Sequence, residues 1–312
     1  MESLQLSFNS VLPIFILMAF GYLLRLFKVA EKSHFDAANK LVFRIFLPVM
    51  LFYNIYKTES LKIFDLKLIS FTIIGILSIY ILGYFVVLGV TRDNSKRGVM
   101  LQGFFRSNYA ILGIPLVNYI CGENTIGLAS LMVAIVVPTF NVLAVICLEG
   151  FRKGKVNIFS LIKGIITNPL IIGCILGAVC LVSKVKLPYL IENAVVDVSK
   201  IATPLSIIAL GASFIFTSLK GRVCELLITV FTKLIFSPLI MLTIAVFLGF
   251  KGEALACILI TFGSPIAISS FAMSQEMGGD EKLSAQSIVL SSALCILTLF
   301  GWIFVLSRLG LF

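Results

Sequence analysis

The sequence predicts an all-α polytopic membrane protein whose two halves are inverted repeats of five transmembrane helices. The chain is 59% hydrophobic and 13% charged, whereas a soluble domain is about 45 to 50% apolar and about 25% charged. Apolar runs long enough to cross a bilayer recur along all 312 residues. The prolines and glycines of the first half also return at a constant spacing in the second half. Lipid is therefore the expected surroundings of most of the chain.

Ten apolar runs are candidates for membrane-spanning helices. Such a helix needs about 20 apolar residues because the hydrocarbon core of a bilayer is about 30 Å thick. The runs lie at 7–26, 35–55, 67–90, 98–120, 125–149, 159–182, 190–217, 223–249, 253–275 and 284–308. The first run has neither the basic segment nor the cleavage site of a secretory signal, so it is interpreted as the first helix. The repeats then comprise residues 1–150 and 151–312, and little chain remains for a separate soluble domain.

The positive charge of the chain predicts its orientation. The net charge is +10, but the cations are spread over the short gaps between apolar runs, which argues against nucleic-acid binding. The gaps after runs one, three, five, seven and nine hold more Lys and Arg than the others, among them Arg152, Lys153 and Lys155. The positive-inside rule assigns these gaps to the cytoplasm and both termini to the outside of the plasma membrane. The seven cysteines contain no CxxC pair, so neither a disulfide framework nor a zinc site is expected.

A repeat relates the two halves. An offset of 156 pairs Pro13 with Pro169, Gly21 with Gly177, Lys28 with Lys184, Asp36 with Glu192, Arg44 with Lys200, and Pro48 with Pro204. A shorter offset of 150 then pairs Gly113 with Gly263 and Pro115 with Pro265, which implies a small deletion between them. Because five spans is an odd number, the second copy must enter the membrane from the opposite side. Inverted repeats of this kind are typical of transporters that work by alternating access.

Two helices are expected to break inside the membrane. The fourth run contains Gly113-Ile114-Pro115 and the ninth contains Gly263-Ser264-Pro265. Proline removes a backbone donor and glycine permits unwinding, so each helix should open at these positions. Broken backbone is tolerated only against protein or a wet cavity. The positive ends of the resulting half-helices favour an anionic substrate where the two helices cross.

Polar side chains near the breaks are candidate substrate-binding residues. They are Asn108, Tyr109, Asn118, Asn141, Ser264, Ser269 and Ser270. They could contact the substrate, or they could cap broken backbone and link helices, since an unpaired amide is costly in lipid. Arg106 and Arg44 could form an anion vestibule. Arg106, about two and a half turns before Pro115 on the cytoplasmic side, could equally reach lipid headgroups.

The sequence lacks the motifs of several other classes of membrane protein. No carboxylate falls near the middle of runs three to five or eight to ten, so the buried aspartate pair that exchanges protons for sodium is missing. His34, the single histidine, lies in the first cytoplasmic gap. No HExxH, GxSxG or Walker A motif is present, so neither an enzyme nor an ATP-driven pump is supported, and no cofactor or metal is expected. Gly173-x-x-x-Gly177 permits close helix approach, within the chain or in a homodimer.

Three stretches resemble the auxin efflux carrier family, in its compact bacterial form related to malate and malonate permeases and to the plant PIN-formed carriers. They are SNYAILGIPLVNYICGENTIGLASL, VPTFNVLAV and GSPIAISSFAMSQEMGGDEKLSAQSIVLSS. The resemblance implies ten helices with helices 4 and 9 crossed, as in sodium-bile acid carriers and sodium-proton antiporters. It implies that helices 1, 2, 6 and 7 form a scaffold and helices 3–5 and 8–10 a transport domain that moves as an elevator. It also implies that Asn108, Pro115, Asn141 and Pro265 surround a bound carboxylate, and that the carrier is often a dimer.

The leading hypothesis is a secondary transporter of a small organic anion, either a malate-like dicarboxylate or an auxin-like monocarboxylate. One alternative is a sodium- or proton-coupled carrier of another solute class. Another is a membrane sensor that binds a ligand without transport. The substrate, the direction of flux and the coupling ion are left open by the sequence.

Overall fold

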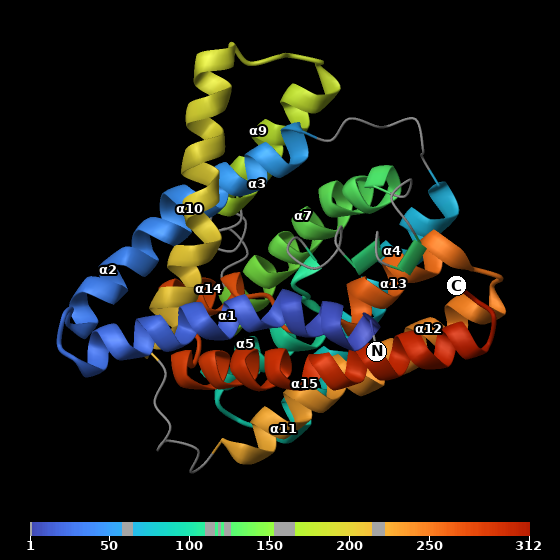
Figure 1. Ribbon diagram of the computed structural model, residues 1–312. Coiled ribbons are helices and arrows are strands. Elements are labelled where there is room, and N and C mark those ends of the chain that lie inside the picture. The colour runs from blue at the N-terminus through green and yellow to red at the C-terminus, as the bar shows by residue number, and fades with distance from the viewer. Residues whose placement is uncertain are drawn as a thin grey trace.

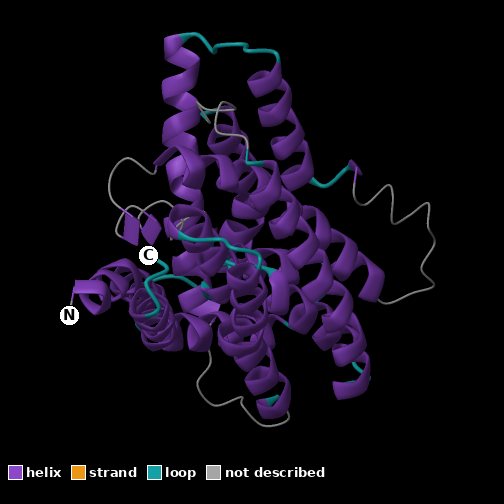
Figure 2. Cartoon of the chain, turned by 90° about the vertical axis from the view of Figure 1, so that its right-hand side faces the viewer, coloured by secondary structure: helices purple, strands orange, loops and turns teal. Residues whose placement is uncertain are grey.

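The computed structural model describes residues 2–57, 65–109, 116–117, 120–121, 126–152, 166–213 and 222–312. Helices joined by short loops make up nearly all of this part of the chain (Figures 1 and 2). The first half contains α1 (Glu2–Leu26), α2 (Lys32–Leu41), the π-helix η1 (Val42–Phe46), α3 (Leu47–Tyr56), α4 (Leu66–Val90), α5 (Asn94–Phe105) and α7 (Ile126–Phe151). The second half contains α9 (Pro169–Val182), α10 (Tyr189–Ser213), α11 (Val223–Phe231), the π-helix η3 (Thr232–Phe236), α12 (Ser237–Phe247), α13 (Gly252–Gly263), α14 (Ser269–Glu276) and α15 (Glu281–Arg308).

Helices lie at all ten predicted apolar runs. Short π-helical turns join α2 to α3 and α11 to α12, so each of these pairs fills one predicted run. Among the described residues, five helices are long and apolar enough to cross a membrane: Leu66–Val90, Leu131–Phe151, Tyr189–Ala212, Val223–Phe247 and Glu281–Arg308. The structure therefore supports a polytopic membrane protein, while the number of ten crossings stays a prediction.

The distribution of apolar side chains suits a lipid environment. Large apolar side chains such as Phe20, Phe85 and Phe247 are exposed on the outer faces of α1, α4 and α12. By contrast, the residues of α13 from Leu255 to Gly263 are buried on every side of the helix. A helix that is apolar and buried all round belongs in the middle of a bundle. Helix α13 and the equally buried second half of α5 are therefore the central helices.

The repeat appears as two matching helix contacts. Helix α1 packs on α10, and α9 packs on α3 (Figure 1). At the first contact a Cβ added to Gly21 would lie 2.1 Å from the carbonyl oxygen of Ile208, and at the second one added to Gly177 would lie 2.7 Å from that of Phe52. Gly21 and Gly177 are 156 residues apart, and so are Phe52 and Ile208. The predicted offset thus relates both partners of each contact, as a twofold exchange between the halves requires.

The ends of α1 and α9 show the same relation. Lys28 and Lys184, which the offset of 156 pairs, have φ angles of 56° and 53°, a left-handed conformation uncommon for residues other than glycine. The hydrogen bond from Val29 N to Leu24 O, 3.0 Å, is matched by one from Val185 N to Cys180 O, 3.1 Å. Both helices thus end in the same left-handed turn.

The small residues of α9 are used within the chain. A Cβ on Gly173 would lie 2.4 Å from the carbonyl oxygen of Pro48 in α3, and Gly177 meets Phe52 of the same helix. Gly173-x-x-x-Gly177 therefore permits close packing between α9 and α3. A homodimer remains a proposal that this face does not support.

Candidate functional site

Helices α5 and α13 end at extended segments that pair with each other, and this pairing forms the crossing. Helix α13 ends at Gly263, and Ser264 is extended, so the ninth predicted run opens at the expected Gly263-Ser264-Pro265 segment before α14 begins at Ser269. Helix α5 ends at Phe105, and Arg106 is extended. The two extended segments pair through an antiparallel bridge between Ser107 and Ile266. In this pairing the Asn108 backbone N–H donates a 2.9 Å hydrogen bond to the Pro265 carbonyl oxygen.

The fourth run has an opening that the sequence analysis did not predict. It falls at Arg106 to Asn108, whereas Gly113 and Pro115 lie outside the described residues, as does Asn118. Helices α5 and α13 have 12 residues each and begin 158 residues apart, at Asn94 and Gly252. In this register Ser107 corresponds to Pro265, so the described parts of the central helices follow an offset of 158, while the pairing of Gly113 and Pro115 by an offset of 150 stays a prediction.

The sequence analysis did not find this opening because the opening depends on tertiary pairing. The segment Arg106-Ser107-Asn108 contains neither glycine nor proline, and its backbone opens because it pairs with Pro265 and Ile266. Pattern reading finds helix breakers, but it cannot find a partner segment more than 150 residues away. The same pairing turns the Arg106 side chain into the bundle.

Arg106 is the central charged residue of the site. Its side chain is buried, with the residue 3% exposed. One terminal nitrogen donates to Asn141 Oδ1 at 2.7 Å and to Ser269 Oγ at 2.8 Å, and the other contacts the sulfur of Met273. Of the two alternatives for Arg106, an anion vestibule or contact with lipid headgroups, this burial contradicts contact with headgroups. Because α5 ends at Phe105, the guanidinium lies at the crossing itself.

Asn141 is oriented for its contact with Arg106. It lies in α7, one turn from Pro138, and its Nδ2 donates a 2.9 Å hydrogen bond to the Val137 carbonyl oxygen. This bond leaves the amide oxygen, an acceptor, facing the guanidinium. The sequence analysis selected Asn141 and Ser269 as candidates, and the structure brings both together around Arg106.

Asn108 lies beside this cluster with a free donor. Its backbone N–H is used by Pro265, but its side-chain Nδ2 is buried without a hydrogen-bond partner among the described residues. Buried polar groups are nearly always paired. This nitrogen therefore does not cap the broken backbone among the described residues.

The other predicted site residues are less central. Tyr109 and Ser264 are buried, but neither contributes to the lining of the cavity described below, and Gly263 and Pro265 shape the break through their backbone. Arg44 is exposed on η1 and does not line this cavity. The structure therefore does not bring Arg44 to the crossing.

A small cavity lies between the crossing and helices α3, α9 and α10. Its volume is about 50 Å³, room for no more than a few water molecules in this conformation. One wall is built by the crossing and α7: Arg106, Ser107, Asn108, Val137, Phe140, Asn141, Ala267, Ile268 and Ser269. The other comes from α3, α9 and α10: Leu47, Met50, Leu51, Leu170, Thr203 and Ser206. Arg106 is the one charged side chain among the described residues of this lining.

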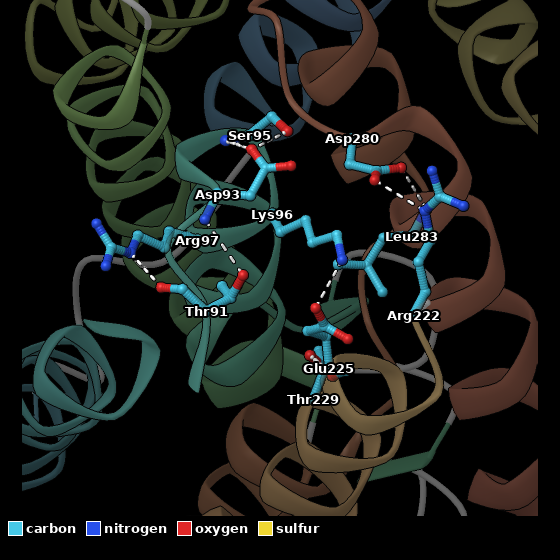
Figure 3. A network of polar contacts seen from close by, with 10 residues as sticks. All are labelled: Thr91, Asp93, Ser95, Lys96, Arg97, Arg222, Glu225, Thr229, Asp280 and Leu283. Atoms are coloured by element: carbon cyan, nitrogen blue, oxygen red, sulfur yellow. Dashed lines mark hydrogen bonds and ion pairs between the residues drawn. The ribbon is translucent and has the colours of Figure 1, made fainter. Parts of the chain in front are cut away.

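Polar contacts also join helices through residues that do not line the cavity. At one end of α5, Lys96 pairs with Glu225 of α11 at 2.7 Å, and Arg222 pairs with Asp280 at the start of α15 at 2.9 Å (Figure 3). The start of α5 is thereby fastened to the starts of α11 and α15. A separate contact joins α14 to α2, because Gln275 of α14 donates to Asp36 of α2 at 2.8 Å.

An apolar helical bundle with a buried cation at two crossed, broken helices is the architecture of a membrane transporter. The sequence profile of the membrane transport protein family matches residues 6–158 and again residues 151–303. The chain therefore belongs to this family, and its resemblance to the auxin efflux carriers is confirmed. The double match also agrees with the repeat seen in the helix contacts.

Two archaeal relatives extend the comparison over nearly the full chain. An uncharacterized transporter of Methanocaldococcus jannaschii is 27% identical over 305 residues, which covers 94% of this chain and 97% of the relative. An uncharacterized transporter of Methanothermobacter thermautotrophicus is 24% identical over 318 residues, covering 96% and 98%.

Proposed function

We propose that this transporter carries a small organic anion whose carboxylate binds Arg106 at the helix crossing. The observation that carries the proposal is the buried guanidinium, which forms no ion pair with any acidic side chain among the described residues. Asn141 and Ser269 supply neutral oxygens, which satisfy donors but do not balance charge. A buried charge without a counter-charge is costly. A bound anion supplies the counter-charge through strong charge-assisted hydrogen bonds.

Two further features support an anion. Helix α14 begins at Ser269, beside the guanidinium, so its positive N-terminal end also faces the cavity. The unpaired Nδ2 of Asn108 adds a neutral donor at the same wall. No acidic side chain of the described residues lines the cavity, so a cationic solute has less support.

The cavity favours a monocarboxylate over a malate-like dicarboxylate. Among the described residues one cation lines it, and the lining from α3, α9 and α10 consists mainly of Leu47, Met50, Leu51 and Leu170. A second carboxylate on this wall would lack a charged partner and would lose its hydration. A carboxylate with a short apolar body matches both walls, with the hydroxyls of Thr203 and Ser206 available for a single polar substituent.

Alternating access is proposed from the division of the cavity walls. Helices α3, α9 and α10 belong to the predicted scaffold, and α5, α7 and α14 to the predicted transport domain, so the cavity lies at their boundary. Sliding of one set along the other would carry Arg106 and its anion across the membrane. The contact between Gln275 and Asp36 joins the two sets and would have to break during such a movement. Residence in the plasma membrane, with both termini outside, is part of this proposal.

Reconstitution into liposomes tests the proposed function. Uptake of radiolabelled lactate, butyrate, indole acetate, malate and malonate is measured under an imposed membrane potential, with empty liposomes as the control. We expect flux of monocarboxylates to exceed flux of malate and malonate. Absence of flux for every carboxylate would overturn the proposal, while faster malate flux would overturn only the preference for one carboxylate.

A further inference from the structure

A second cation is buried in the bundle, at a position the sequence analysis did not select. Lys233 lies near the middle of the apolar segment Val223–Phe247, and the residue is 0% exposed. It belongs to the π-helical turn η3, Thr232–Phe236, and such turns occur frequently at functional sites. No acidic side chain among the described residues forms an ion pair with it. An ionisable side chain inside a membrane span calls for a functional explanation.

The contact of Lys233 is with the broken end of α13. Its Nζ lies 3.4 Å from the carbonyl oxygen of Thr261, in the last turn of that helix. In an uninterrupted helix this carbonyl would accept a hydrogen bond from the backbone N–H of residue 265. Residue 265 is proline, which has no N–H. Lys233 therefore occupies the place of the donor that Pro265 removes.

A neighbouring proline in a continuous helix shows that a neutral donor can fill such a place. Pro238 likewise lacks the N–H that the carbonyl of Leu234 would accept, and the indole N–H of Trp302 donates to that carbonyl at 3.1 Å. The bundle thus satisfies one such carbonyl with a neutral side chain and the other with a lysine. Hydrogen bonding alone does not explain why a charged group, which is costly to bury, stands at Thr261.

The location explains the charge. Carbonyl groups at the C-terminal end of a half-helix carry the negative end of the helix dipole, and in transporters built from inverted repeats such ends coordinate the coupling Na⁺ or H⁺. We propose that the Lys233 ammonium is a built-in cation at the broken end of α13, which stands in place of a soluble coupling cation. Anion transport by this chain then needs neither Na⁺ nor K⁺. This last consequence rests on the proposed function, whereas the cation site does not.

Thermal unfolding of the purified protein in detergent tests the cation site without any transport measurement. NaCl is exchanged for choline chloride at constant ionic strength, and Tm is recorded for the wild type, Lys233→Ala and Lys200→Ala. Lys200 is the matched control because its side chain is exposed and pairs with the exposed Asp197. We expect the wild type and Lys200→Ala to be insensitive to the exchange. Lys233→Ala should lose about 4 °C or more, and Na⁺ or methylammonium should restore part of this loss saturably, whereas tetraethylammonium should not.

Three outcomes would overturn the inference: a saturable rise of the wild-type Tm with Na⁺, no loss of Tm in Lys233→Ala, or a loss that no small cation restores. If Lys233→Ala gives no folded protein, Lys233→Gln decides, because it keeps a neutral donor. A wild-type Tm in Lys233→Gln contradicts the inference, and a lowered Tm supports it. In proteoliposomes, carboxylate flux that requires Na⁺ would refute the inference and leave the proposed function intact. Absence of all flux would refute the function, while the Tm series still decides the cation site.

Discussion

The Arg106 guanidinium donates a 2.7 Å hydrogen bond to the Oδ1 atom of Asn141, joining the broken end of α5 to the proline-containing helix α7. Both residues are buried. Their contact holds a positive charge at the helix crossing with its donors directed at neutral oxygens. The first three predictions below follow from this arrangement, and the fourth from the packing of the repeats.

Removing the charge should remove anion binding. We expect Arg106→Gln to weaken binding of the transported monocarboxylate by about 10-fold to 150-fold, since hydrogen bonds to charged groups contribute about 1.5 to 3 kcal/mol. Arg106→Lys should be intermediate, because it keeps the charge and loses the planar fork of donors. Isothermal titration in detergent measures the affinities, and Arg44→Gln, on an exposed residue, is the control. Wild-type affinity in Arg106→Gln would rule out Arg106 as the carboxylate partner.

A carboxylate at position 141 should imitate the substrate. In Asn141→Asp the new charge lies against Arg106, so an internal ion pair forms and excludes an external anion. We expect transport to be lost while the thermal unfolding temperature is kept or raised. Asn141→Ala, which leaves the guanidinium without its amide acceptor, should instead lower the free energy of unfolding by about 1 to 3 kcal/mol. Retained anion flux in a folded Asn141→Asp variant would contradict the proposed geometry.

Replacing Asn108 distinguishes its two proposed roles, substrate contact and capping of the broken backbone. Because its Nδ2 has no hydrogen-bond partner among the described residues, Asn108→Ala should change the free energy of unfolding by less than about 1 kcal/mol. Anion affinity should fall about 5-fold to 10-fold, the loss expected for one neutral hydrogen bond. Denaturant unfolding and titration on the same preparations check this. Parallel losses of stability and affinity would favour the capping alternative.

The matched glycines should respond alike to a methyl group. In Gly21→Ala and Gly177→Ala the new Cβ meets a backbone carbonyl oxygen at 2.1 Å and 2.7 Å, so the helices must move apart. We expect each change to reduce the free energy of unfolding by about 1 to 3 kcal/mol. Gly301→Ala, where no atom lies within 4 Å of the added group, should be neutral or stabilising by up to about 1 kcal/mol. Thermal unfolding of the three variants measures the difference, and an equal response in all three would contradict the packing.

Much of the fold is predictable because its causes are local. Apolar runs of about 20 residues predict membrane-spanning helices. Pro265 opens the ninth run at its own position because proline lacks a backbone N–H. The offset of 156 that pairs Lys28 with Lys184 can be found in the sequence. In the structure both lysines have a positive φ angle at the end of a helix. Candidate residues Asn108, Asn141 and Ser269 are also accessible to sequence reasoning, because amides and hydroxyls beside a predicted break are few.

Other features depend on segments far apart in the chain. The opening at Arg106 to Asn108 has no local signal and arises from pairing with Pro265 and Ile266. One signal in the sequence could have selected Lys233: it is a lysine inside an apolar run, four residues after a threonine and five before a proline. Its partner, however, is 28 residues away on another helix. Such partners are assigned only when the helices pack.

By itself, the sequence determined that this chain is a helical membrane protein made of two related halves, because hydropathy, charge bias and proline act through the residues that carry them. The tertiary structure alone decided which backbone opens opposite Pro265, and it buried Arg106, for which the sequence left an anion vestibule and lipid headgroups as alternatives. It also placed Lys233 at the carbonyl that Pro265 leaves without a donor. The reason is physical: the cost of burying a charge or an unpaired backbone group is set by what packs against it, and packing joins residues that the sequence keeps apart.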